Sequence, residues 1–294
     1  MKKKYFKISI ADIILNFIML LVIIITLYPF YYCLILSFNN GYDTYLGNLY
    51  FFPRMFTLAN YKMVFVNQRI FTAFVITTSR TLIGTATSVF FTASVAYGLS
   101  KKDLMFRKTY MILGIITMYF NGGLIPFYFV LRDLNLLNSF AVFIIPSLFA
   151  FFNAILFMTF FRTIPESLRE SARIDGASEA FIYLRIILPL SVPIIATIAL
   201  FNGVGHWNAW FDSQFFTTDP KYRTLQLILK EIMAKASAQE ELKRQMGISL
   251  DSNLYTVESI RYATMMVAIG PIIFIYPFLQ RYFIKGIMIG SIKG

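Results

Sequence analysis

The segment LRESARIDGASEAFIYLRIILPL at residues 168–190 is a charged interruption in an otherwise strongly apolar chain. Long runs rich in Phe, Ile, Leu and Ala lie on both sides of it. Its charged side chains are Arg169, Glu170, Arg173, Asp175, Glu179 and Arg185. A chain that leaves apolar sequence for such a segment, and returns to it through Leu188-Pro189, is typical of a membrane protein with a polar loop.

The composition supports this interpretation. The 294 residues are 57% hydrophobic and 18% aromatic, only 14% are charged, and the mean hydropathy is +0.64. A soluble domain carries about 25% charged residues. Apolar runs of about 20 residues, the length that crosses a bilayer, recur along the chain. We therefore expect an all-α, polytopic membrane protein.

The net charge of +12 does not indicate a nucleic-acid partner, because the basic residues lie at the ends of apolar runs. The single cysteine, Cys33, cannot form an internal disulfide. The lone histidine, His206, cannot build a metal site from histidine alone, and no Cys or acidic cluster lies near it in the sequence.

The apolar runs predict one transmembrane domain over residues 1–294 with six spans. The first span follows the basic start MKKKYFK and is too long for the apolar core of a cleaved signal peptide. The third span is interrupted by Asn121-Gly122-Gly123. The expected spans are residues 11–38, 70–99, 108–131, 139–161, 187–211 and 259–284.

The basic residues of the short loops predict the orientation in the membrane. Residues 99–109 contain four Lys or Arg, whereas residues 132–138 contain only one. Short cytoplasmic loops are enriched in Lys and Arg, while long loops count for little. Both termini and the loop at residues 163–189 are therefore expected in the cytoplasm, and the loop at 213–258 outside the cell.

Helix signals within the charged segment predict two short helices. Pro165 and Glu166 suit the start of the first, and Glu166 with Arg169 and Glu170 with Arg173 are pairs at i,i+3 spacing.

Gly176 ends the first helix, and Ser178 begins the second. The resulting helix–turn–helix lies at the membrane surface, where its small residues let another protein approach closely. An amphipathic interfacial linker is the alternative on physical grounds.

The same segment resembles the signature loop of binding-protein-dependent ABC importer permeases. That signature is E-A-A, three residues, G, nine residues, I-x-L-P; here it reads Glu170-Ser171-Ala172, Gly176 and residues 186–189, with Ser171 in place of Ala. In this family the loop docks on the ATPase. The resemblance assigns ATPase coupling to Glu170, Ser171, Ala172, Asp175, Gly176, Ala177, Leu188 and Pro189.

Three further stretches resemble the carbohydrate-importing, maltose-type branch of the family. They are Trp207-Asn208, the C-terminal QRYFIKGIMIGSIKG with Ser291 where Ala is usual, and NGGLIPFY at residues 121–128. The last is similar to permeases for complex oligosaccharides in Gram-positive bacteria and to alginate-importer permeases.

The resemblance implies a subunit of an ATP-driven oligosaccharide importer in the bacterial cell membrane. Its expected partners are a second related permease, two ATPase subunits, an extracellular solute-binding lipoprotein, membrane lipid and the oligosaccharide itself. The chain has no G-x-x-x-x-G-K-[ST] nucleotide loop. We therefore expect a transporter subunit that is not itself an enzyme and binds no cofactor, with ATP and Mg on the ATPase subunits.

Two polar–aromatic groups are candidates for the solute path. The broken helix at residues 121–123 is tolerated in a membrane only against protein or a wet cavity. The alternatives are close helix packing for the first group and an interfacial aromatic belt for the second. The candidates are Tyr119, Asn121 and Tyr128 in span three, and Asn202, Trp207, Asn208 and Trp210 in span five.

Arg80 lies well inside span two. An arginine at the bilayer centre costs about 2.5–3.5 kcal/mol on insertion scales, so it must face protein or water. It is either a contact for an acidic sugar or a structural hydrogen-bond or ion-pair anchor, and the anchor is the simpler interpretation.

The expected outer loop contains an amphipathic helix, whose apolar residues follow helical spacing. In the maltose-type family this loop reaches the binding protein; a self-contained lid is the alternative. The apolar face is Leu225, Ile228, Leu229, Ile232 and Met233.

Other classes of protein fit the sequence less well. A secondary transporter needs intramembrane carboxylates and a membrane enzyme needs a polar catalytic cluster, and the expected spans contain almost none of either. An importer for a peptide or a polyamine remains open within the permease class.

Overall fold

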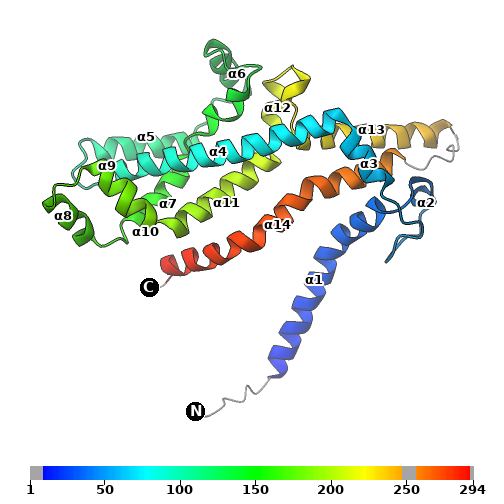
Figure 1. The fold of residues 1–294 in the computed structure, drawn as a ribbon, viewed down its shortest axis with the longest axis horizontal. Coiled ribbons are helices and arrows are strands. Elements are labelled where there is room, and N and C mark those ends of the chain that lie inside the picture. The colour runs from blue at the N-terminus through cyan, green and yellow to red at the C-terminus, as the bar shows by residue number, and fades with distance from the viewer. Residues whose placement is uncertain (1–8, 247–255, 292–294) are drawn as a thin grey trace. The chain divides into compact units, whose positions relative to one another are not determined.

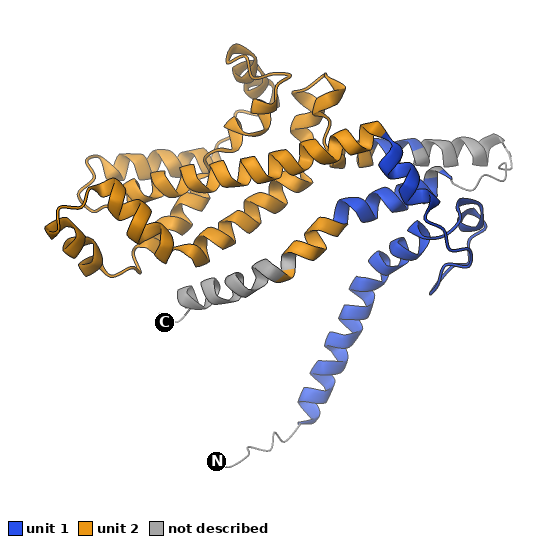
Figure 2. Cartoon of the chain, in the orientation of Figure 1, with its two compact units in different colours: residues 1–67, 231–269 blue, residues 68–230, 270–294 orange. Residues whose placement is uncertain are grey.

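The computed structural model describes residues 9–246 and 256–291, with side chains described to residue 235 and at 256, 258–275 and 277. Helices form the regular structure of these residues, apart from one isolated β-bridge between Asn39 and Phe56 (Figure 1). The expected all-α class is confirmed. The chain forms two compact units, residues 1–67 with 231–269, and residues 68–230 with 270–294 (Figure 2).

Unit 1 contains α1, an apolar helix with hardly any buried residues. Ser9 and Asp12 form a capping box at its start, where the Asp12 carboxylate accepts from the Ser9 backbone N–H at 2.9 Å. Its most hydrophobic window is 0% buried, as expected for a helix surrounded by lipid or by another subunit. The helices of unit 1 are α1 (Ile10–Ser37), α2 (Gly41–Tyr45), α3 (Ala59–Val66), and parts of α13 (Leu225–Met246) and α14 (Val257–Ser291).

Unit 2 is built around α4 (Gln68–Ser100), which packs against α11 (Val192–Asn208) and α7 (Phe151–Phe161). Ala93 and Ala96 of α4 are fully buried and let these helices approach closely. The large side chains of the core include Phe157, Phe161, Ile182, Ile187 and Ile198.

Shorter helices connect these three. Several are interrupted by proline or by turns, which places their polar backbone groups inside the bundle. They are α5 (Arg107–Tyr119), α6 (Leu124–Asp133), the 3-10 turns Phe140–Phe143, Ile145–Ser147 and Pro220–Tyr222, α8 (Glu166–Ile174), α9 (Glu179–Ile182), the π-helical turn Tyr183–Ile187, α10 (Leu188–Leu190) and α12 (Phe211–Phe215).

Within the described residues, three helices are long and apolar enough to cross a membrane, Ile10–Ser37, Gln68–Ser100 and Glu258–Ile275. Three bent pairs bring the number to six if each pair is one span. The expected break at residues 120–123 is present, and the chain bends there by 118°. The six spans and the single domain stay predictions, because length and composition alone support them.

The sequence did not predict the other two bends. Between Phe140–Ser147 and Phe151–Phe161 the chain bends by 49°, so residues 139–161 are not one continuous helix. Between Glu179–Leu190 and Val192–Phe215 it bends by 79°. Pro146, Pro189 and Pro193 lie near these bends and lack the N–H that a continuous helix needs.

We predict that Gly114→Ala destabilises the protein. A Cβ at this position of α5 would lie 2.1 Å from the Phe151 ring, which is 6% exposed and has little room to move. Overpacking of this kind costs about 1–3 kcal/mol. The thermal unfolding midpoint of the purified protein in detergent should fall.

Gly98→Ala is the matched control, because nothing lies within 4 Å of a Cβ added there. Its midpoint should stay equal or rise, since Ala favours helix over Gly. Equal midpoints for the two variants would contradict the close packing of α5 on α7.

Candidate functional site

The charged segment at residues 163–189 folds as two helices joined at Gly176. The α8 helix ends with Asp175, and Gly176 takes φ of +79°, a conformation that favours glycine. The Gly176 N–H donates to Arg173 O at 3.0 Å and the Ala177 N–H to Ala172 O at 2.9 Å. These two bonds are the Schellman pattern that closes a helix, so the expected glycine end is confirmed.

The second half of the segment is embedded in the core of unit 2. The Ser178 hydroxyl caps α9 by accepting from the Phe181 N–H at 3.3 Å. Ile182 and Ile187 are fully buried, and the Tyr183 hydroxyl lies 3.0 Å from that of Ser94 on α4. A π-helical turn follows α9, which the sequence analysis did not predict.

Ion pairs order the first helix and connect it to the second. Glu166 and Arg169 pair at 3.7 Å, as predicted. The predicted pairing of Arg173 with Glu170 is wrong, because Arg173 instead reaches across Gly176 to Glu179 at 2.8 Å. Glu179 gathers further donors, which makes it the better partner.

Glu179 carries the strongest electrostatic signal of the segment. Its carboxylate accepts from Lys101 at 2.8 Å, from the Tyr97 hydroxyl at 2.8 Å and from Arg173. Lys101 first, then Tyr97 and Arg173, lower the pKa of Glu179 to about 2 against the opposing effect of burial. A carboxyl whose pKa is depressed loses its contribution only as the pH falls toward that value, so Glu179 stays ionised at physiological pH.

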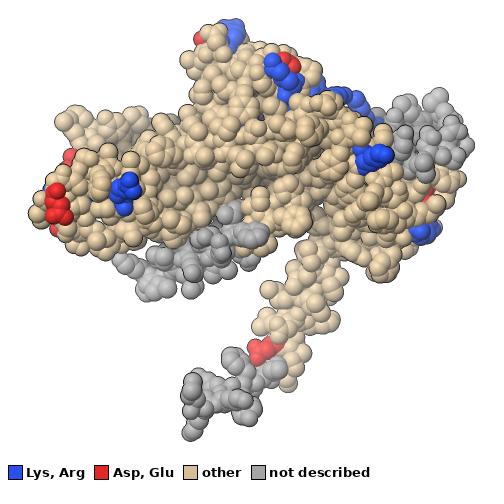
Figure 3. Space-filling view, in the orientation of Figure 1, with Lys and Arg blue, Asp and Glu red and all other residues tan. Residues whose placement is uncertain are grey.

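The expected coupling residues divide into an outward face and an inward one. Ile174 at the tip of α8 is 86% exposed, and acidic side chains lie over this end of the molecule (Figure 3). The small side chains toward the core allow the segment to lie flat on the bundle. Glu170, Ser171, Asp175, Gly176 and Pro189 are exposed, whereas Ala172, Ala177 and Leu188 are half-buried.

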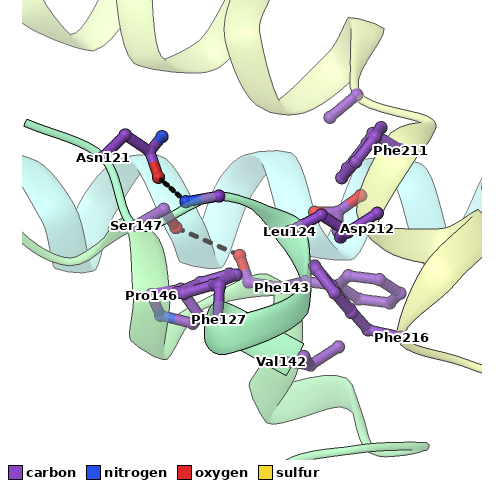
Figure 4. Close-up of a pocket in the computed structure, with 12 residues that line it drawn as sticks. Asn121, Leu124, Phe127, Val142, Phe143, Pro146, Ser147, Phe211, Asp212 and Phe216 are labelled. Atoms are coloured by element: carbon purple, nitrogen blue, oxygen red, sulfur yellow. Dashed lines mark hydrogen bonds between the residues drawn. The ribbon is translucent and has the colours of Figure 1, made fainter. Parts of the chain in front are cut away.

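A second candidate site is a cavity of about 520 Å³ beside the broken helix (Figure 4). The α6 helix, the two 3-10 turns before α7, and α12 contribute its wall. The lining residues are Asn121, Gly123, Leu124, Phe127, Val142, Phe143, Pro146, Ser147, Ala209, Phe211, Asp212 and Phe216.

Aromatic rings and a few polar groups share the cavity wall. The Asn121 carbonyl oxygen accepts from the Gly123 N–H at 2.9 Å, which fixes the amide at the helix break. The Ser147 hydroxyl donates to Phe143 O at 3.1 Å, and Asp212 adds a carboxylate. Phenyl rings beside hydrogen-bonding groups suit the stacking faces and hydroxyls of a sugar.

Arg80 lies behind this wall and is paired with Asp212. Its Nη1 donates to Asp212 Oδ1 at 2.9 Å, its Nη2 to Asp212 Oδ2, and its Cζ lies 4.6 Å from the Phe143 ring centroid. The Arg80 side chain is 2% exposed and that of Asp212 is 22% exposed. Of the two possible roles, the structure places Arg80 in the ion-pair anchor, and Asp212 is the group that reaches the cavity.

The remaining span-three candidates are not gathered around Asn121. Tyr119 is 80% exposed and does not line the cavity. Tyr128 is 37% exposed, and its ring lies 6.4 Å from that of Phe216, which does line it. The structure thus brings Asn121 to the cavity and leaves Tyr128 at one remove.

The span-five candidates make structural contacts. Asn202 accepts from the Asn153 amide at 3.0 Å and donates to the Ser88 hydroxyl at 3.1 Å, so it connects α11 with α7 and α4. Trp207 is 6% exposed, packs edge-on to Phe74, and lines a separate apolar cavity of about 290 Å³.

The two residues at the end of α11 meet the start of α13. Asn208 accepts from the Gln226 amide at 3.4 Å, and Lys230 Nζ lies 3.2 Å from the centroid of the Trp210 ring. The structure does not bring either residue into the cavity beside Asn121.

The sequence analysis missed Asp212, Ser147 and the phenylalanines of the cavity. Asp212 carries a signal that could have found it, because a buried arginine in a membrane requires an acid or a carbonyl nearby. The phenylalanines carry none, since Phe is common throughout the chain.

Comparisons with known proteins identify the class. A model of the family described as binding-protein-dependent transport system inner membrane component matches residues 109–289. The chain is 35% identical to the Bacillus subtilis polygalacturonan/rhamnogalacturonan transport system permease protein YtcP, over all of both chains. It is 37% identical to the Bacillus subtilis protein LplC, over 92% of this chain and 90% of that one.

A solved structure is also similar. It is a crystal structure of a bacterial ABC transporter involved in the import of the acidic polysaccharide alginate. The TM-score is 0.84 at 29% sequence identity, over 96% of this chain and 100% of that chain.

We predict that Asp212→Asn destabilises the protein more than removal of the whole ion pair. The substitution leaves the Arg80 charge buried without its carboxylate, and breaking a buried pair costs about 3 kcal/mol or more. The double variant Arg80→Met, Asp212→Leu should unfold at higher detergent denaturant than Asp212→Asn alone.

The control is Asp133→Asn, which removes the exposed pair with Arg132 and should cost about 1 kcal/mol or less. If Asp212→Asn proved as mild as this control, the ion pair would not anchor α4 to the chain after α11.

Proposed function

The chain belongs to the family of binding-protein-dependent transport system inner membrane components, and we propose that it is the permease subunit of an ATP-driven importer of oligosaccharides. The observation that supports this proposal best is the segment at residues 163–189, which has the family's signature spacing and ends its first helix at Gly176 with φ of +79°. Its outward face is free of contacts with the rest of the bundle at Ile174, which is 86% exposed.

The coupling segment receives movement from an ATPase. The exposed tip of α8 fits a groove on another protein, while α9 and the turn after it are fixed in the core of unit 2. The chain itself has no nucleotide loop, so ATP and Mg are bound by the ATPase subunits. Because one permease chain forms half of a pathway, the complex contains a second, related permease and two ATPases.

The solute is an oligosaccharide. Three observations support this class: the names of the relatives, the alginate importer among similar structures, and the cavity of about 520 Å³ beside the helix break. The cavity combines four phenylalanine rings with Asn121, Ser147 and Asp212. Asn121 is the residue through which the broken helix contacts the solute.

The same cavity bears on the charge of the bound sugar unit. Both terminal nitrogens of Arg80 are occupied by Asp212, and the exposed group is the carboxylate. A carboxylate accepts hydrogen bonds and repels a second carboxylate. The cavity therefore favours sugar hydroxyls over uronate groups at this point of the path.

The loop at 213–258 lies outside the cell and meets the solute-binding protein. Leu225 and Ile228 on the apolar face of α13 are buried, Leu229 and Ile232 are half-buried, and Met233 is 40% exposed. The polar part that would meet the binding protein begins near residue 236, and residues 247–255 lie outside the described residues. Both termini are cytoplasmic in this orientation.

We predict that Gly176→Leu abolishes import while the protein still inserts. A leucine at φ of +79° is strained, and its side chain would project beside the docking face. Import of labelled oligosaccharide and stimulation of ATP hydrolysis by the binding protein should both be lost in the reconstituted complex. Co-purification of the wild-type chain with an ATPase tests the assignment directly.

Gly47→Leu is the matched control, since Gly47 has φ of +75° but lies outside the coupling segment. It shares the backbone strain and should retain import. Normal import by Gly176→Leu, or failure of both variants alike, would count against ATPase docking at this segment.

A second prediction concerns the solute contact. Asn121→Ala should lower the import rate about tenfold or more, because the amide both fixes the helix break and faces the cavity. Tyr119→Ala should import at nearly the wild-type rate, since Tyr119 is outside the cavity lining. Basal ATPase activity checks that both complexes assemble, and equal import by the two variants would remove Asn121 from the path.

A further inference from the structure

The Glu179 carboxylate joins three separate parts of unit 2. The Tyr97 hydroxyl, near the end of α4, donates to Oε2 at 2.8 Å. Lys101, in the loop after α4, lies 2.8 Å from the same oxygen. Arg173, at the end of α8, lies 2.8 Å from Oε1. Glu179 is outside the family signature, so the resemblance gives it no role.

One of these contacts spans the hinge between the two helices. Arg173 lies three residues before Gly176 and Glu179 three residues after it. A helix pair joined through a glycine can change its angle unless other contacts hold it. The Arg173–Glu179 ion pair closes a loop across Gly176 and fixes the angle of α8.

The burial of the two helices differs. Ile182 after the hinge is 0% exposed, so α9 is held in the core, whereas Ile174 of α8 is 86% exposed. The α8 helix contacts the bundle through Ala172 and through two arginines, Arg169, which donates to Phe161 O at 3.0 Å, and Arg173. Polar contacts therefore fix α8, and Glu179 supplies one of the two main ones.

We propose that Glu179 is a positioning residue that ties α8 to the end of α4, so that displacement of α8 by a docked ATPase moves α4 as well as α11. The covalent route from α8 runs through α9 and α10 into α11. The Glu179 contacts provide a second route, into α4. That helix carries Arg80, which holds Asp212 at the cavity wall, so the second route ends at the candidate solute site.

The test uses Glu179→Gln in the complete importer with its ATPases and binding protein. Glutamine keeps the shape and can still accept from the Tyr97 hydroxyl, but it removes both ion pairs. Complex assembly and basal ATP hydrolysis should stay at wild-type levels. Stimulation of hydrolysis by the loaded binding protein, and the number of solutes imported per ATP, should fall about three- to tenfold, the range expected for losing two partly exposed ion pairs.

Two single variants examine the same contacts. Arg173→Gln and Lys101→Gln should each cause part of the loss. Adding either to Glu179→Gln should cause little further loss, because contacts that share one partner are not additive. Asp133→Asn, which breaks an exposed ion pair elsewhere in unit 2, is the charge-matched control and should import normally.

Three outcomes would overturn the proposal. Normal stimulation in Glu179→Gln would show that the contacts carry no movement. Loss of assembly in that variant would make Glu179 a folding residue. Full additivity with Arg173→Gln and Lys101→Gln would show that the three side chains act separately.

The role of Glu179 rests on the proposed function, and the wild-type protein separates the two. A wild-type chain that neither binds an ATPase nor imports oligosaccharide would refute the function itself. A wild-type chain that does both, beside a Glu179→Gln variant that equals it, would refute the positioning role alone.

Discussion

The ion pair between Arg80 and Asp212 joins the interior of α4 to the turn after α11, and much of unit 2 is arranged around it. A guanidinium within a membrane-spanning helix must be neutralised and hydrogen-bonded. Asp212 meets that need because the chain turns at the end of α11 and returns toward α4. The same turn brings Phe211 and Phe216 opposite the 3-10 turns and so forms one side of the cavity. Neutralising one buried charge and forming a site are thus two results of one chain reversal.

Polar contacts along α4 divide its length into regions with different tasks. Arg80 lies toward one end, beside the cavity. Ser88 in the middle accepts from Asn202 of α11, and Tyr97 and the following Lys101 hold Glu179 at the other end. Between these contacts, small buried residues such as Ala93 and Ala96 allow α7 and α11 to pack closely. A long helix held rigidly by its neighbours, with polar side chains at both ends, is well suited to connect an ATPase contact with a solute contact.

The sequence predicted the features that depend on local pattern. The all-α class, the helix end at Gly176, the break at Asn121 and the amphipathic start of α13 all follow from periodicity or from the conformational range of glycine. It did not predict features that depend on long-range partners. Arg173 was expected to pair with Glu170 within its helix, because the spacing is right, but Glu179 offers a carboxylate that Lys101 and Tyr97 also hold in place. Asn202 was expected in the solute path, yet its amide connects helices that are far apart in the sequence. The cavity needed Asp212, Ser147 and Phe143 to come from separate segments, which no spacing rule reveals.

The π-helical turn Tyr183–Ile187 has a consequence for how this chain tolerates insertions and deletions. Such a turn is an α-helix that has accepted one extra residue. Removing one residue there would restore a regular helix, but each residue turns a helix by about 100°, so the residues before the turn would rotate relative to the helix after it. Ile182 would leave the core, and the docking face of α8 would point elsewhere. A frame-preserving loss of one codon in this short stretch should therefore be far more damaging than most substitutions in it, and the length of the stretch is under stronger selection than its side chains.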